Sequence, residues 1–207
     1  MPISKDSAVY RTEETLSTRE KILEASLKLF SSKGYLGTTT REIASEAGIA
    51  EVTLFRYFPS KEKLFEEVIN TNSFLPTLRG ILPKIMVMSY REALTVIAAR
   101  FLETLTLRKD LIQIMHLEIQ RYPEKIQKIY HAFIDEMFKT LASYFKAMQE
   151  KTALREFDAE TAARAFLGMF FSYFTAEEFL LHKKYKTGDT NLIISEFVGI
   201  FIQGTLR

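Results

Sequence analysis

Apolar side chains recur at helical spacing along most of this chain. Positions 94, 97, 98, 101 and 105 are all apolar, which is the i, i+3, i+4, i+7, i+11 spacing of one helix face. The same period continues from Pro123, a favourable first helical residue, to Met148. No strand-like alternation and no internal repeat stands out in the sequence. The pattern predicts an all-α protein.

The first helix is delimited by its own end signals. Ser17 and Glu20 form an S-x-x-E capping box, and the apolar positions that follow cover a broad arc. Charged residues fall on the opposite stripe, and Gly34 supplies the stop. The sequence therefore predicts one long amphipathic helix near the N-terminus.

Residues 38–65 contain three helix starts and two breaks. Thr39 and Glu42 form a second capping box, which opens a helix of about two turns that ends at Gly48. Another helix must begin within two residues, Pro59 breaks it, and Ser60 caps the next one. Two short helices joined by a tight glycine turn and braced by a longer helix are the layout of a helix-turn-helix. On spacing alone, an ordinary helical hairpin in an all-α core is the alternative.

The residues at these breaks closely resemble the TetR family of transcriptional repressors. The positions that carry the resemblance are Phe30, Gly34, Tyr35, Thr39, Ile43, Ala44, Ala47, Gly48, Ile49, Leu54, Phe55, Tyr57, Phe58, Lys61 and Leu64. The resemblance implies an N-terminal helix-turn-helix three-helix unit and a C-terminal helical bundle domain. We expect a mobile arm over residues 1–16, a DNA-binding domain over 17–66, and an effector-binding and dimerisation domain over 67–207.

Carried over residue by residue, the resemblance implies two kinds of contact with double-stranded operator DNA. The residues expected to read base edges are Glu51, Val52, Thr53 and Arg41. The residues expected to contact phosphates are Thr39, Tyr57 and Lys61. Thr39 lies at a helix N-terminus, where backbone N–H groups and the helix dipole favour an anion. Phe55 stands where the family commonly has tyrosine, so we expect it only to pack.

Charge and cysteine content limit how the protein can contact DNA and in which cell compartment we expect it. Residues 17–64 contain eight Lys or Arg and six Asp or Glu, so DNA contact must come from a few placed groups. The chain has no cysteine, which excludes disulfides and thiolate metal sites and fits a reducing cytoplasm. The N-terminus lacks the apolar core of a signal peptide, and the longest apolar runs are about half the ~20 residues of a membrane span. We expect a soluble cytoplasmic protein without a membrane partner.

An enzyme is the rival class of function. His116, His131 and His182 are scattered without metal-ligand spacing. The chain shows no glycine-rich phosphate loop, no G-x-S-x-G and no H-E-x-x-H motif. We expect no enzymatic activity, no cofactor, no metal and no catalytic residue.

Residues 159–182 and 190–204 are apolar on nearly all sides. A homodimer in which these two helices pair with their copies would explain the excess of apolar surface. The resemblance implies such a four-helix interface. The residues we expect there are Ala165, Gly168, Ser172, Phe197 and Phe201. A tightly packed monomer core is the alternative.

The resemblance also implies a small-molecule effector site in the C-terminal domain. The candidate lining is Phe101, Leu105, Met115, His116, Phe133, Met137, Phe166 and Phe170, and for each of them a plain core position is the simpler alternative. Because few charged residues are available at this candidate site, we expect an apolar or aromatic ligand. The function implied is a dimeric regulator, most simply a repressor, that a ligand releases from a palindromic operator by moving the helix from Lys61 to Pro76. A DNA-bound architectural or protein-docking dimer without an effector is the alternative.

Overall fold

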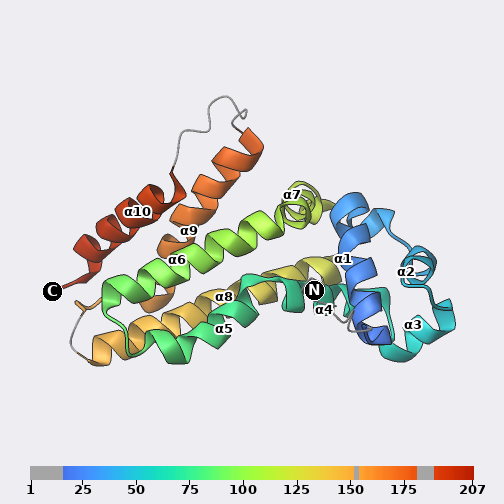
Figure 1. The fold of residues 1–207 in the computed structure, drawn as a ribbon, viewed down its shortest axis with the longest axis horizontal. Helices are drawn as coiled ribbons and strands as arrows, with labels where there is room; N and C mark the ends of the chain where they lie inside the picture. Colours follow the sequence, from blue (N-terminus) through green and yellow to red (C-terminus); the bar gives the residue numbers. More distant parts are fainter. Residues whose placement is uncertain (1–15, 152–153, 181–188) are drawn as a thin grey trace, which may run out of the picture.

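The computed structural model describes residues 16–151, 154–180 and 189–207, and its secondary structure there is helical. The helices are α1 (Thr18–Gly37), α2 (Thr40–Glu46), α3 (Glu51–Tyr57), α4 (Lys61–Asn72), α5 (Phe74–Ile85), α6 (Tyr90–Leu107), α7 (Lys109–Glu118), η1 (Ile119–Arg121), α8 (Glu124–Glu150), α9 (Ala159–Thr175), η2 (Ala176–Leu180) and α10 (Thr190–Thr205). The molecule is elongated, with α1–α3 at one end and α10 toward the other (Figure 1). The predicted all-α fold is confirmed, whereas the expected N-terminal arm lies almost wholly outside the described residues.

Short-range signals define the N-terminal helices as predicted. Both capping boxes are present, because the carboxylates of Glu20 and Glu42 accept hydrogen bonds from the backbone N–H groups of Ser17 and Thr39 at 2.8 Å. Gly34 interrupts α1 at φ 71° and ψ 175°. Gly48, in the turn between α2 and α3, has φ 68°. Side chains with a Cβ rarely adopt these backbone angles, so glycine permits both sharp changes of direction.

The helix that begins at Lys61 is shorter than predicted. It ends at Asn72 rather than near Pro76, and Ser73 caps the following helix by accepting a hydrogen bond from the N–H of Leu75 at 3.3 Å. Pro76 lies in the first turn of α5, where its missing N–H would have no helical partner in any case. The rod from Lys61 therefore spans about 18 Å and leads directly into α5.

The periodic segments of the C-terminal part are confirmed as α6 and α8. The apolar segment predicted over residues 159–182 divides into α9 and the π-helical turn η2, and its last two residues lie outside the described residues. The helices α5 and α7 were not predicted. Gly80 and two prolines interrupt the apolar pattern of α5, and α7 is only ten residues long. None of the described helices combines the length and apolarity that a membrane span requires.

Two apolar cores fill the part of the molecule that the structure describes. One joins α5, α6, α8, α9 and α10. The other contains the interior of α1–α4, and it also takes in residues of α7, η1 and the first turns of α8: Leu111, Met115, Ile119, Tyr122 and Ile126. The DNA-binding unit predicted over residues 17–66 therefore has no separate core, because the C-terminal part supplies one wall of it.

Candidate nucleic-acid interface and ligand cavity

The short helix α3 buries one ridge and exposes the other. Leu54 and Phe58 are buried in the core beneath it. Val52, Phe55 and Tyr57 are 69%, 44% and 48% exposed, respectively, at the end of the molecule (Figure 1). Exposed large side chains on a protruding helix suit contact with a major groove about 12 Å wide. The expectation that Phe55 only packs was wrong, since its ring is partly free to meet a partner.

Glu51 makes a structural contact that the sequence did not predict. Its carboxylate accepts a hydrogen bond from the hydroxyl of Thr40 at 2.6 Å, and the Nε atom of Arg41 lies 3.9 Å away. These contacts join the start of α3 to the start of α2. Glu51 therefore links the starts of the two helices, and its base-reading role stays a prediction. The Arg41 side chain is 89% exposed and remains free to reach DNA.

The two donors of Thr39 are already engaged. Its backbone N–H and its hydroxyl donate to the carboxylate of Glu42 at 2.8 and 2.9 Å. Lys33 binds the same carboxylate at 2.7 Å, and together these groups lower the pKa of Glu42 to about 2. Glu42 is thus ionised at neutral pH and occupies the position where a phosphate was expected. A phosphate could use the predicted Thr39 donors only if Glu42 moved.

Lys61 lies at the first position of α4, against an aromatic ring. Its ammonium nitrogen is 4.2 Å from the ring centroid of Tyr35, within the range of a cation–π contact. Partial burial lowers the pKa of Lys61. Burial is the main cause that raises the pKa of Tyr35, and the negative charge of nearby Glu62 adds to it. The position of the predicted phosphate anchor is therefore set by α1 as well as by α4.

A polar clamp holds the Gly34 turn against the C-terminal part. The hydroxyl of Tyr122 accepts a hydrogen bond from the N–H of Tyr35 at 3.1 Å and donates one to Glu118 at 3.0 Å. Burial raises the pKa of Tyr122 to about 12; Glu118 adds to the rise, whereas the hydrogen bond from Tyr35 opposes it. A Cβ added at Gly34 would lie 2.2 Å from the Oε2 atom of Glu118. Glycine is needed at this position for close approach as well as for its backbone angles.

An apolar cavity of about 100 Å³ lies between the two cores. Residues from the end of α4 through α8, together with one residue of α9, form its wall. They are Ile69, Asn72, Ser73, Phe74, Phe101, Thr104, Leu105, Arg108, Leu111, Ile112, Met115, Tyr130, Phe133, Ile134, Met137 and Phe171. Ile69, Leu111 and Met115 also belong to the core of the DNA-binding end. Any molecule in the cavity would therefore touch side chains on which the helix-turn-helix rests.

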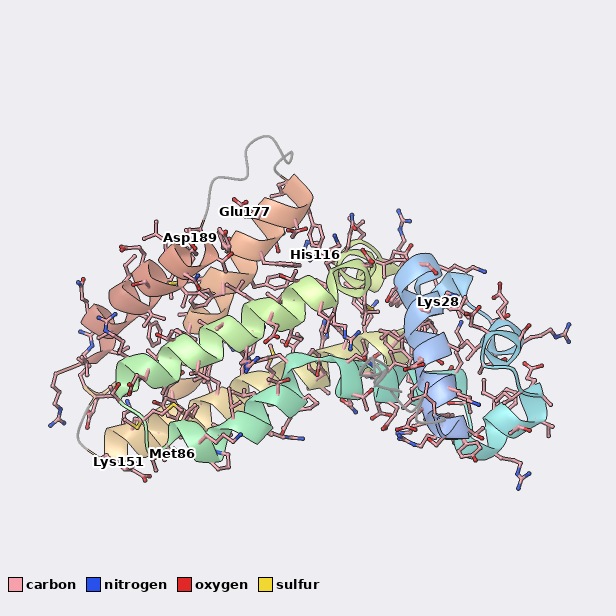
Figure 2. The ribbon with its side chains drawn as sticks, viewed as in Figure 1. Lys28, Met86, His116, Lys151, Glu177 and Asp189 are labelled. Atoms are coloured by element: carbon pink, nitrogen blue, oxygen red, sulfur yellow. The ribbon has the colours of Figure 1, made fainter. Side chains whose placement is uncertain are left out.

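The structure divides the eight residues predicted to line an effector site. Those that line the cavity are Phe101, Leu105, Met115, Phe133 and Met137. His116 instead lies exposed on α7 (Figure 2). Phe166 and Phe170 are fully buried in the C-terminal core, where the ring centroid of Phe166 is 4.9 Å from that of Phe201. Helical spacing identified apolar positions but not the side of each helix that faces the cavity.

Sequence reasoning missed the polar groups of both sites. Glu118 lies on no apolar stripe, and nothing local indicates that it and Tyr122 meet the Gly34 turn. Arg108 and Tyr130 line the cavity, yet one marks a helix junction and the other reads as part of an ordinary amphipathic pattern. Arg108 stands next to Lys109 at the end of an apolar helix, so the local sequence does not single it out. Its meaning depends on the neighbouring helices.

The residues predicted for a dimer interface fall into two groups. Ala165, Gly168 and Ser172 are exposed along one stripe of α9, and Phe197 on α10 is partly exposed. Phe201 instead is buried, with its ring centroid 5.6 Å from that of Phe145 within the same chain. The prediction for Phe201 is corrected, because its side chain completes the core of one protomer.

Comparisons with known proteins agree with this architecture. Residues 22–68 match the model of the tetR family of bacterial regulatory proteins. Residues 92–203 match the C-terminal domain of AefR-like transcriptional repressors. The uncharacterized HTH-type transcriptional regulator YvkB of Bacillus subtilis is 34% identical over 162 residues, which cover 76% of this chain and 81% of YvkB.

Solved structures share the fold at lower identity. A structure assigned to a TetR-family transcriptional regulator from Mesorhizobium loti has a TM-score of 0.76 and 22% identity, and the match covers 92% of this chain and 97% of that chain. The transcriptional regulator FadR from Bacillus subtilis, in complex with stearoyl-CoA, has a TM-score of 0.66 and 15% identity, with 89% and 98% covered. The chain belongs to the tetR family of bacterial regulatory proteins and is a DNA-binding transcriptional regulator of the helix-turn-helix type.

Proposed function

We propose that this regulator binds a palindromic operator as a homodimer in the cytoplasm and represses transcription until a small apolar or aromatic ligand releases it. The observation that carries the proposal is the exposed face of α3 at one end of the molecule (Figure 1). Two such helices, held about 34–36 Å apart in a dimer, would enter successive major grooves of one duplex. The exposed stripe of Ala165, Gly168 and Ser172 supports pairing through α9 and α10.

The exposed groups suggest how contacts with DNA are shared. Val52 and Thr53 face base edges, with Val52 suited to a thymine methyl, and Arg41 reaches either a base or a phosphate. Tyr57 and Lys61 contact phosphates. Glu51 is assigned to positioning because Thr40 and Arg41 engage its carboxylate. Thr39 contributes to phosphate binding only when Glu42 gives up its hydrogen bonds.

The cavity supports regulation by a ligand over the alternative of an architectural dimer. FadR of Bacillus subtilis, which shares this fold, holds stearoyl-CoA in its structure. Here the cavity wall includes Ile69 of α4 and Leu111 and Met115 of α7, which also pack in the DNA-binding end. A ligand that fits the cavity better in one arrangement of these helices will shift the dimer toward it, because differential affinity sets the coupling.

We expect Lys61→Ala to weaken binding to all DNA sequences alike, because a phosphate contact carries no sequence information. The slope of log affinity against log salt should flatten by about 0.9 for each lost phosphate contact. The matched control is Lys84→Ala, which removes a lysine from the last turn of α5, outside the DNA-binding end. Fluorescence anisotropy with a duplex of arbitrary sequence, over a range of salt concentrations, measures both slopes. Equal slopes for the two variants would remove Lys61 from the interface.

A further inference from the structure

The polar groups in the cavity wall are few, and most already have partners. The side-chain amide of Asn72 donates to the carbonyl of Val68 at 3.0 Å. The hydroxyl of Thr104 donates to the carbonyl of Arg100 at 2.9 Å. Within the described part of the chain, the guanidinium of Arg108 has no ion pair, and the wall holds no Asp or Glu. Among the described residues, the electrostatic character of the cavity is therefore set by the guanidinium of Arg108.

Arg108 lies where α6 ends and α7 begins, and it is partly exposed. A cation in this position stands at the rim of the cavity, between the apolar wall and water. Tyr130 reaches the same cavity from α8, and burial raises the pKa of its hydroxyl. A hydroxyl that stays protonated can donate a hydrogen bond. The two groups left for a ligand are thus both donors, and one of them is charged.

Apart from Asn72, Ser73 and Thr104, the remaining wall is apolar, and the cavity is small. Its side chains include Phe101, Leu105, Leu111, Met115, Phe133 and Met137. The cavity of about 100 Å³ is well below the roughly 300–1,000 Å³ of typical ligand sites. It suits a short acyl chain better than an extended ring system. A carboxylate at the rim would be stabilised only if it were paired and hydrogen-bonded, which the Arg108 guanidinium can provide in a bidentate manner.

We propose that the cavity binds a short- or medium-chain aliphatic monocarboxylate, with its chain on the apolar wall and its carboxylate on Arg108, assisted by Tyr130. This inference rests on the proposed function, because it names the ligand of the same site. A quaternary ammonium ligand should bind poorly, because the described wall would repel it through Arg108 and offers it no carboxylate. A neutral alcohol of equal length would bury the same chain but would leave Arg108 without its partner.

Isothermal titration calorimetry with butanoate, hexanoate and octanoate tests the proposal, with octan-1-ol, octylamine and choline as neutral and cationic probes. Affinity for the carboxylates should rise by about fourfold per added methylene until the cavity is filled. Octanoate should bind at least tenfold more tightly than octan-1-ol. Equal affinity for octanoate and octan-1-ol, or preference for octylamine or choline, would overturn the assignment.

Variants test the role of Arg108 directly. Arg108→Gln should weaken octanoate binding at least tenfold and leave octan-1-ol binding within about twofold, whereas Arg108→Lys should restore part of the octanoate affinity because it keeps the charge. The matched control is Arg100→Gln, two turns earlier on α6, where the guanidinium pairs with Glu103 at 2.7 Å outside the cavity. If Arg108→Gln bound octanoate as the wild type does, the proposed carboxylate contact would be excluded.

DNA binding, measured on the same proteins by anisotropy, separates this inference from the proposed function. If none of the carboxylates binds while the wild type still binds DNA with a normal salt slope, the ligand class is wrong and the DNA-binding function stands. Loss of DNA binding in the wild type would instead refute the function on which the inference rests.

Discussion

Replacing Gly34 with alanine will destabilise the protein by about 2–4 kcal/mol. The backbone there has φ 71° and ψ 175°, a region that is essentially restricted to glycine and costs other residues roughly 1–3 kcal/mol. The new methyl group would also lie 2.2 Å from the Oε2 atom of Glu118. Glu118 must then move and give up its hydrogen bond with Tyr122, which adds about 1 kcal/mol. Urea unfolding followed by circular dichroism measures the loss.

Gly48→Ala is the matched control. Gly48 also has a positive φ, of 68°, but an added Cβ there would meet nothing within 4 Å. Its substitution should therefore cost only the backbone strain. Gly34→Ala should regain at least about 1 kcal/mol when Glu118→Ala is present as well, because the closest steric conflict is then removed and only the 3.1 Å approach to the Tyr122 hydroxyl remains. If Gly34→Ala lowered the free energy of unfolding equally with and without Glu118, the contact between Gly34 and Glu118 would have no part in the destabilisation.

Gly168→Asp will convert the protein to a folded monomer and weaken operator binding by at least 100-fold. An added Cβ at Gly168 meets nothing within 4 Å in the protomer, so the chain itself should fold normally. Across a symmetric interface, the two new carboxylates would face each other in a dry environment, which is strongly unfavourable. A monomer binds one half-site and loses the high effective concentration of its second recognition helix.

Gly80→Asp is the control for this change. Gly80 also lies in a helix and is exposed, and an added Cβ meets nothing within 4 Å, but it is on α5, away from α9. Sedimentation velocity should show a dimer for Gly80→Asp and a monomer for Gly168→Asp. A dimer in both variants would place the interface elsewhere.

Local signals predicted the fold well because they act over a few residues. A capping box needs only two side chains three positions apart, and both predicted boxes form. The end of α4 was misplaced because the helical pattern continues through Ser73 and the proline that follows is tolerated in a first turn. The Ser73 cap, rather than Pro76, marks the end of α4.

The site was predicted less completely because its contacts join distant segments. Thr40 and Glu51 are 11 positions apart, and Tyr35 and Tyr122 are 87 apart, so neither hydrogen bond has a periodic signature. Phe166 and Phe170 of α9 were candidates for the ligand site as well as for the core, and Phe166 faces Phe201 in the core. Which face of a buried helix meets a cavity depends on how the other helices pack against it.

In the proposed dimer, two α3 helices read a palindromic operator. Selection of binding sites by the purified protein from a pool of random duplexes, followed by sequencing, measures whether the preferred sites are symmetric. We predict enrichment of an inverted repeat whose half-sites lie about one helical turn, or a multiple of it, apart. Thr53→Ala should relax the preference at particular base pairs of each half-site without abolishing the repeat. Enrichment of no sequence, or of a single asymmetric half-site, would contradict the account.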